Sequence, residues 1–198
     1  GLRVSRLCLG TMTFGPEWGW GCDVATAKRM LDLYYDKGGN FLDTANIYTK
    51  GHSERIIGDH IGNNPHRRDK MIIATKFGGS LYTGDPNAGG AHRKAIYEQV
   101  HHSLRRLQTF YIDLSWMYFS DPHTPIDETM GALEDLVRSG KVRYLGVSDT
   151  PAWKVAQANV LAQFRGWSQF IGLQIEYSLL ERTVEQELVP MAKELGDE

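Results

Sequence analysis

The sequence predicts an α/β fold built on a parallel sheet, and three observations support this prediction. Apolar runs alternate with amphipathic segments about every 30 residues, which is typical of repeated right-handed βαβ units. Polar residues stand at the carboxyl ends of six successive apolar runs. No G-x-G-x-x-G motif follows any of these runs, which disfavours a doubly wound dinucleotide-binding sheet. A ring of polar rim residues favours a closed (β/α)8 TIM barrel, with six of the eight β/α units present in this chain.

The composition is that of an ordinary soluble protein. The 198 residues are 41% hydrophobic and 23% charged, with a formal net charge of −2, so we expect one domain over residues 1–198. This charge predicts no nucleic-acid partner, and no apolar run is long enough to predict a membrane span. Cys8 and Cys22 are too few for a disulfide scaffold or a four-cysteine zinc site, and no signal peptide is visible. A cytoplasmic location without a membrane partner is therefore expected.

The six expected strands are short apolar runs that end in glycine or in polar residues. The fourth run is almost entirely apolar or aromatic, as expected for a strand that is buried on both faces. The strands are expected at residues 4–10, 41–42, 71–76, 111–119, 142–148 and 170–178.

The first two helices have recognisable starts and stops. A glycine- and tryptophan-rich loop over residues 11–21 leads to Asp23, a good N-cap, and two glycines end that helix at residues 38–39. Ser53 is expected to cap the second helix, which breaks at residues 63–65. The residues expected to face inward are Val24, Ala27, Met30, Leu31 and Tyr34 in the first helix, and Ile56, Ile57 and Ile61 in the second.

The later helices follow similar signals. A loop over residues 77–90 precedes the third helix, and loops of this length are often functional. Thr124 and Thr150 are expected N-caps, each followed by a proline at the first helical position, and Pro190 opens a last helix over residues 191–195. Apolar residues along the three middle helices are Ile96, Val100, Leu104 and Leu107, then Met130, Leu133 and Val137, then Trp153, Val160 and Phe164.

Three residues near strand ends form a candidate site. Asp43 closes the second strand, Tyr48 lies in the following loop, and Lys76 closes the third strand. The carboxyl ends of parallel strands meet at one rim, so the three side chains can face one cavity. A phenol has a pKa of about 10, and a nearby ammonium lowers it by favouring the phenolate. We therefore expect Tyr48 to donate a proton, Lys76 to tune its pKa, and Asp43 to orient Lys76.

The chain resembles the aldo-keto reductase family along its whole length. The resemblance implies a (β/α)8 barrel of aldo-keto reductase type and NADPH-dependent reduction of a small-molecule aldehyde or ketone to the alcohol. The matching pieces, in chain order, are residues 9–15 (LGTMTFG), 41–45 (FLDTA) with Tyr48, 53–58 (SERIIG), 74–76 (ATK), 124–130 (TPIDETM), 140–148 (GKVRYLGVS) and 174–178 (QIEYS).

The resemblance also implies roles for individual residues. Asp43, Tyr48 and Lys76 match three of the family's four catalytic positions. The fourth is normally a histidine at the end of the fourth strand, and Tyr118 stands there in this chain. The positions implied to bind the cofactor are Thr11 and Met12 beside the nicotinamide, Ser148, Asp149 and Gln174 around its carboxamide, and Asp43. Asp149 stands where many members have asparagine.

Several alternatives stay open at this level. The hydroxyl of Tyr118 either replaces the imidazole as a donor to the substrate oxygen, or its ring simply packs at the barrel mouth. Trp18 and Trp20 either wall a substrate pocket or anchor their loop. The seven histidines show no metal-binding spacing, so we expect no metal.

A second class of function competes with the enzyme: a catalytically weakened nucleotide-binding or interaction module on the same fold. Six strands do not close an eight-stranded barrel, and bare strand edges are aggregation-prone. Either further residues or another chain must cover them, so a homo-oligomer is one expectation.

Overall fold

The computed structural model describes residues 1–196, which contain one parallel sheet of six strands. The strands pair in chain order, so each β/α unit places its strand beside the previous one. This order has no switch point, which distinguishes it from a doubly wound sheet. The strands are β1 (Leu9–Gly10), β2 (Phe41–Asp43), β3 (Ile72–Phe77), β4 (Ile112–Met117), β5 (Val142–Ser148) and β6 (Phe170–Gln174).

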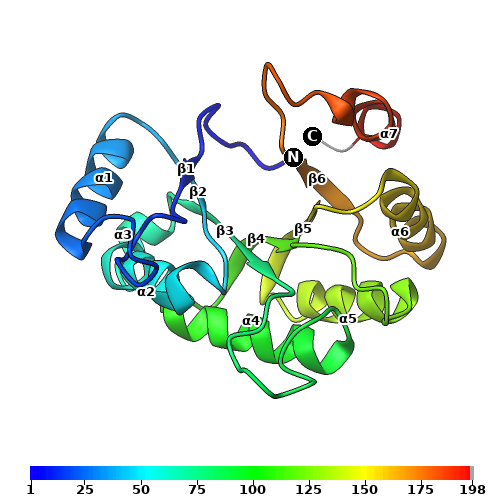
Figure 1. Ribbon diagram of the computed structural model, residues 1–198, viewed down its shortest axis with the longest axis horizontal. Helices are drawn as coiled ribbons and strands as arrows, with labels where there is room; N and C mark the ends of the chain where they lie inside the picture. The colour runs from blue at the N-terminus through cyan, green and yellow to red at the C-terminus, as the bar shows by residue number, and fades with distance from the viewer. Residues whose placement is uncertain (197–198) are drawn as a thin grey trace.

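The helices surround the outer face of the curved sheet, whose concave face is open between β1 and β6 (Figure 1). The prediction of a barrel with six of its eight units is thus confirmed as a curled half-barrel. None of the helices within residues 1–196 has the length and apolarity needed to cross a bilayer. The helices are α1 (Val24–Asp36), α2 (His52–Ile57), α3 (Pro65–Arg68), α4 (Arg93–Leu107), α5 (Ile126–Arg138), α6 (Ala152–Arg165) and α7 (Leu188–Leu195), with short helical turns η1 (Tyr48–Gly51), η2 (Gly58–Gly62) and η3 (Thr183–Glu185).

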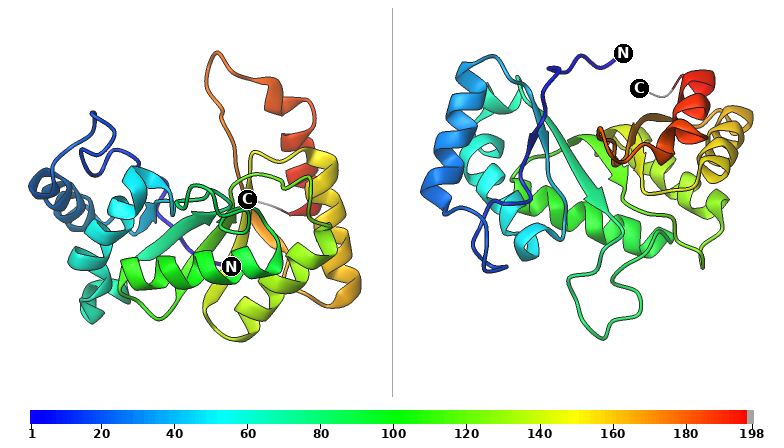
Figure 2. Two further views of the ribbon diagram at one scale, coloured as in Figure 1. Left: turned by 60° about the horizontal axis from the view of Figure 1, so that its bottom comes forward. Right: turned by 45° about the horizontal axis from the view of Figure 1, so that its top comes forward.

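The main hydrophobic core lies between the sheet and the helices. Buried strand residues such as Ile73 and Val147 contact buried helix residues such as Leu133 in one continuous cluster. Successive side chains of a strand point to opposite faces, so the neighbours of these residues point into the barrel. The loop from β3 to α4 projects from this core at the edge of the molecule (Figure 2).

A second, smaller cluster fills the barrel interior. It consists of Ala74, Leu114 and Trp116, with Phe41 and Tyr144 packed against it. The Trp116 ring lies over Gly146, where a Cβ atom would come within 2.3 Å of the indole. Because Trp116 is the register partner of both Gly146 and Lys76, its indole forms part of the layer that contains the candidate site.

Several predicted elements are confirmed. Asp23 caps α1, since its carboxylate accepts a hydrogen bond of 2.7 Å from the Thr26 amide. β5 spans the predicted residues 142–148. β4 is buried at every residue, as its apolar run predicts, but it covers only Ile112–Met117 of the predicted residues 111–119, and Phe119 is exposed.

The two edge strands are shorter than predicted. The strand expected over residues 4–10 is reduced to β1, and the strand expected over residues 170–178 ends at Gln174. Each edge strand pairs with one neighbour within the described residues, so hydrogen bonds from one side only define its ends. Leu7, part of the expected first strand, is 80% exposed.

Some predicted helix starts are also wrong. Ser53 does not cap α2, because the helix begins at His52, directly after the left-handed Gly51. The N-cap residues of α5 and α6 are Pro125 and Pro151, not the predicted Thr124 and Thr150, so each helix begins one residue later than predicted. The last helix begins at Leu188, before the predicted start at residue 191.

The inward face of α6 was not predictable from its large apolar residues. Trp153 and Phe164 are 65% and 86% exposed, and Val160 is exposed as well. The buried face consists of small residues, Ala152, Val155, Ala158 and Ala162, with Asn159. Both faces carry apolar side chains, so periodicity alone does not identify the face that packs. The predicted inward position of Met30 in α1 is wrong for the same reason, since Ala27 and Leu31 are the buried residues there.

Candidate active site

Asp43 and Lys76 form a buried ion pair at the carboxyl end of the sheet. The ammonium of Lys76 donates to Asp43 Oδ2 at 2.5 Å and to the Thr44 carbonyl at 3.0 Å. Lys76 is 1% exposed, and Asp43 is also buried. A buried charge of this kind needs both a counter-ion and further hydrogen bonds, and Lys76 has both.

Tyr48 completes this group from the turn that follows β2. Its hydroxyl lies 3.1 Å from Lys76 Nζ, and the ammonium lies 4.8 Å from the centre of its ring. The structure therefore brings together the three residues predicted from the strand ends, with Asp43 and Tyr48 both in contact with the ammonium of Lys76.

Burial, and after it the negative charge of Asp43, raises the pKa of Tyr48 to about 12. This contradicts the expectation that Lys76 would lower the pKa. The ammonium faces Asp43 at closer range than Tyr48, so its charge is largely balanced, and desolvation of the phenolate dominates. Tyr48 is thus held as a neutral phenol at ordinary pH, which is the form that can donate a proton.

Tyr118 lies beside Tyr48, at the rim position next to β4. A hydrogen bond between the two hydroxyls lowers the pKa of Tyr48, although burial and Asp43 outweigh it. The pKa of Tyr118 is raised by burial first, then by Tyr48. Lys76 Nζ also lies 5.7 Å from the centre of the Tyr118 ring. Tyr118 therefore packs at the barrel mouth with its hydroxyl directed toward the same site, so the two alternatives for it are compatible.

The residues expected to bind a nicotinamide lie around this group, at the same rim. Gln174 donates from Nε2 to Asp43 Oδ1 at 3.1 Å, and it is the register partner of Ser148 across β5 and β6. Asp149 is exposed and adopts a left-handed conformation with φ of 41°. At the other edge, Thr11 is fully buried and Met12 is exposed.

A chain of hydroxyl groups behind the site was not predicted. Ser53 donates to the Thr11 carbonyl at 2.8 Å, and its oxygen lies 2.8 Å from the Thr11 hydroxyl and 2.9 Å from the Thr44 hydroxyl. These contacts join β1, β2 and α2 beneath Asp43. The motif at residues 53–58 pointed to a helix start, but a serine before a helix is also the signal for a cap, which hid this role.

A buried carboxylate supports the same region from the helix layer. Glu54, fully buried, accepts from Thr75 at 2.6 Å and from Arg106 Nε at 2.6 Å. Thr75 directly precedes Lys76, so this contact holds the end of β3 between α2 and α4. No strand-end signal marks Glu54 or Arg106, because both lie within helices.

Aromatic side chains from the loop over residues 11–21 lie against Tyr48. The rings of Trp18 and Tyr48 are 6.4 Å apart in an edge-on arrangement, and Trp20 lies 5.4 Å from Trp18. This loop therefore supplies apolar surface beside the phenol.

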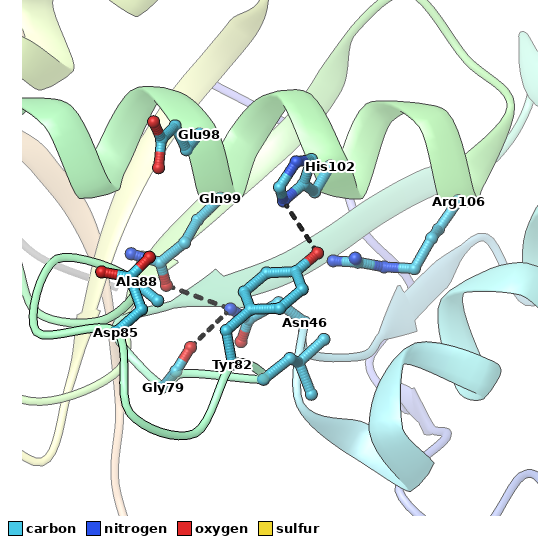
Figure 3. Close-up of a pocket in the computed structure, with 10 residues that line it drawn as sticks. Asn46, Gly79, Tyr82, Asp85, Ala88, Glu98, Gln99, His102 and Arg106 are labelled. Carbon is cyan, nitrogen blue, oxygen red and sulfur yellow. Dashed lines mark hydrogen bonds between the residues drawn. The ribbon is translucent and has the colours of Figure 1, made fainter.

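A separate cavity of about 340 Å³ lies beneath the loop that joins β3 to α4 (Figure 3). Asn46 spans its inner wall, donating to the Gly79 carbonyl at 2.9 Å and to Gln99 Oε1 at 3.0 Å. Near the opening, the Tyr82 hydroxyl lies 3.5 Å from His102 Nδ1. The cavity opens beside the projecting loop, and none of Asp43, Tyr48 and Lys76 lines it. Within residues 1–196, no three His, Cys, Asp or Glu side chains come together as a metal site requires.

The six parallel strands, paired in chain order and covered by helices, define a β/α-barrel protein with a buried Lys–Asp pair and a phenol at its rim. The family model for the aldo/keto reductase family matches residues 6–197. The chain belongs to the aldo-keto reductase family.

Similar proteins in fungi have names that describe oxidoreductases. The chain is 44% identical to an aryl-alcohol dehydrogenase of Pestalotiopsis microspora, over 98% of this chain and 52% of the relative. It is 42% identical to a norsolorinic acid reductase of Aspergillus flavus, over 99% of this chain and 52% of the relative. An aryl-alcohol dehydrogenase [NADP(+)] of Phanerodontia chrysosporium is 39% identical over 96% of this chain and 52% of its own length. The chain thus spans about half the length of the relatives it matches.

Proposed function

We propose that this protein reduces an aldehyde or ketone to the alcohol with NADPH as the hydride donor, and that Tyr48 supplies the proton. The observation that carries this proposal is the contact of one buried ammonium, Lys76, with Asp43 at 2.5 Å and with the Tyr48 hydroxyl at 3.1 Å. Nothing in ordinary packing requires a lysine, a carboxylate and a phenol to share a desolvated rim position.

The rim residues are suited to a nicotinamide. Ser148 and Gln174 are register partners on β5 and β6, and a hydroxyl and an amide together offer the donors and acceptors that a carboxamide needs. The contact of Gln174 with Asp43 would link cofactor binding to the ion pair. Thr11, Met12 and Asp149 would complete the surroundings of the ring. The name of the Phanerodontia chrysosporium relative includes NADP(+), which supports the choice of NADPH.

The chain's own residues handle the proton. When the carbonyl carbon accepts a hydride, negative charge builds on the carbonyl oxygen, and a positioned acid must neutralise it. Tyr48, protonated at neutral pH, gives its hydroxyl proton to that oxygen, so the alcohol forms and a phenolate remains on Tyr48. Lys76 at 3.1 Å then stabilises this phenolate, while Asp43 fixes the ammonium in place. The Tyr118 hydroxyl, which is hydrogen-bonded to that of Tyr48, would stabilise the same phenolate.

The substrate is proposed to be an aromatic carbonyl compound. Trp18, Trp20 and the ring of Tyr118 provide flat apolar surface around the Tyr48 hydroxyl. Aromatic rings favour offset or edge-on contacts with other aromatic rings. The names of the fungal relatives, which refer to aryl alcohols and to norsolorinic acid, support the same choice.

The proposal is tested by Tyr48→Phe, which removes the acidic hydroxyl and keeps the ring. Loss of a general acid typically costs roughly 10²–10⁴ in rate, so kcat for an aromatic aldehyde should fall within this range. NADPH affinity, measured by calorimetric titration, should be retained. Tyr97→Phe is the matched control, since Tyr97 lies on α4 with its hydroxyl toward the exposed Asp135, and its turnover should stay at the wild-type level.

Unchanged turnover in Tyr48→Phe would remove Tyr48 from the mechanism. NADPH binding by the wild type without any carbonyl turnover would instead favour a nucleotide-binding module.

A further inference from the structure

The backbone immediately after Tyr48 is strained. Thr49 (φ 45°, ψ 43°), Lys50 (φ 56°, ψ 38°) and Gly51 (φ 83°, ψ 1°) are three consecutive left-handed residues. Single glycines often adopt this conformation, but a β-branched residue such as threonine is an outlier there. Such strain persists only where surrounding contacts hold it in place.

The side chain of Thr49 provides those contacts. Thr49 is fully buried, and its hydroxyl donates to the Phe14 carbonyl at 2.7 Å while it accepts from the Ser53 amide at 3.0 Å. One hydroxyl therefore joins the loop over residues 11–21 (the aromatic loop), the turn after Tyr48, and the first turn of α2. Both the donor and an acceptor site of the hydroxyl are used, so valine, which has the same shape, cannot replace it.

Arg106 limits movement of the same turn from the other side. A Cβ atom on Gly51 would lie 2.9 Å from Arg106 Cδ, so the arginine chain packs directly over the turn. The guanidinium is held by Glu54, which also accepts from Thr75 beside Lys76. The turn that carries Tyr48 and the strand that carries Lys76 are thus fixed to one another through a short set of buried contacts.

We infer that Thr49 is a positioning residue, which holds the strained turn so that the Tyr48 hydroxyl stays within hydrogen-bonding reach of Lys76. This inference rests on the proposed function, because it gives the strained turn a role in proton transfer. Thr49 does not contact the reacting groups. It affects proton transfer by fixing the position of Tyr48.

The test compares Thr49→Val and Thr49→Gly with Thr49→Ser. Valine keeps the shape and removes the hydroxyl, serine keeps the hydroxyl, and glycine removes the hydroxyl but suits the left-handed backbone, so that it folds even if valine does not. A misplacement of about 1 Å can cost on the order of 10² in rate, so Thr49→Val and Thr49→Gly should lose about that factor in kcat with little change in KM. Thr49→Ser should stay close to wild type.

Two measurements separate positioning from simple loss of stability. Thr129→Val is a matched control, because Thr129 is buried and its hydroxyl donates to the Ala91 carbonyl at 2.9 Å, away from the site. Thr129→Val should lose stability without losing turnover. A titration of Tyr48 followed by NMR of isotope-labelled tyrosine should show its pKa falling from the wild-type value in Thr49→Val and Thr49→Gly, as the ring gains access to solvent.

The inference would be overturned if both Thr49→Val and Thr49→Gly kept the wild-type turnover and the wild-type pKa of Tyr48. It would also be overturned if Thr49→Ser and Thr129→Val lost as much turnover as Thr49→Val. If the wild type itself reduces no carbonyl compound, the proposed function fails. The tyrosine titration then still decides whether Thr49 positions Tyr48.

Discussion

At the scale of single residues, the protonation of Tyr48 depends on its burial and on the charges of Asp43 and Lys76 beside it. Lys76 was expected to act on Tyr48, yet its ammonium lies closer to Asp43, and burial raises the pKa of Tyr48 to about 12. The sequence could indicate that three such residues meet at a rim, because each stands near a strand end. It could not indicate how deeply they are buried, since burial depends on the aromatic loop and on α2. The direction of the pKa shift is therefore a property of the fold.

The raised pKa of Tyr48 predicts a specific dependence of stability on pH. The folded protein holds the phenol proton up to about pH 12, whereas an ordinary tyrosine releases it near 10.0. Below pH 10.0 the contribution of Tyr48 to stability is fully present, and between these two values the free energy of unfolding should fall as pH rises, because the unfolded chain binds fewer protons. Urea unfolding of wild type and Tyr48→Phe across this range measures the effect. Parallel curves for the two proteins would contradict the assigned burial of Tyr48.

At the scale of elements, the edge strands differ most from their predicted lengths. β5 matches its predicted residues and β4 is three residues shorter than predicted, whereas the edge strands β1 and β6 are five and four residues shorter. The packing face of α6 was also missed, because its buried residues are small and its large residues point outward. The left-handed conformation of Thr49 and Lys50 carries no sequence signal, since glycine or asparagine usually marks such a conformation and the glycine of this turn comes only at Gly51.

The packing of Trp116 over Gly146 inside the barrel predicts that one added methyl group lowers the stability of the protein. Gly146→Ala would place Cβ 2.3 Å from the Trp116 indole, so the ring must move. Overpacking of this kind typically costs about 1–3 kcal/mol, which urea unfolding can measure. Gly131→Ala is the control. Gly131 lies within helix α5, and the nearest atom that its added Cβ would meet is 3.4 Å away, on Arg93. At this helical position alanine should raise the free energy of unfolding by about 0.5–1 kcal/mol. Equal effects at both positions would contradict the described packing of Trp116.

At the scale of the whole molecule, the candidate site lies on the concave side of a curled half-barrel whose two edge strands are β1 and β6. Leu7, which precedes β1 in the sequence, and Leu179 and Leu180, which follow β6, are all strongly exposed. The site nonetheless draws on both edges, since Thr11 follows β1 and Gln174 ends β6 and contacts Asp43. The family and the barrel architecture could be predicted from sequence motifs, because these motifs recur at strand ends in a fixed order.

The proposed carbonyl reduction at this rim can be tested by following the transferred hydride. The protein would be mixed with NADPH that carries deuterium at the transferable position and with an aromatic aldehyde, and the product would be examined by mass spectrometry and NMR. We expect the wild type to form an aryl alcohol with one deuterium on the carbinol carbon, and Tyr48→Phe to form much less of it. Bound NADPH with no labelled alcohol, or equal labelling by the two proteins, would contradict it.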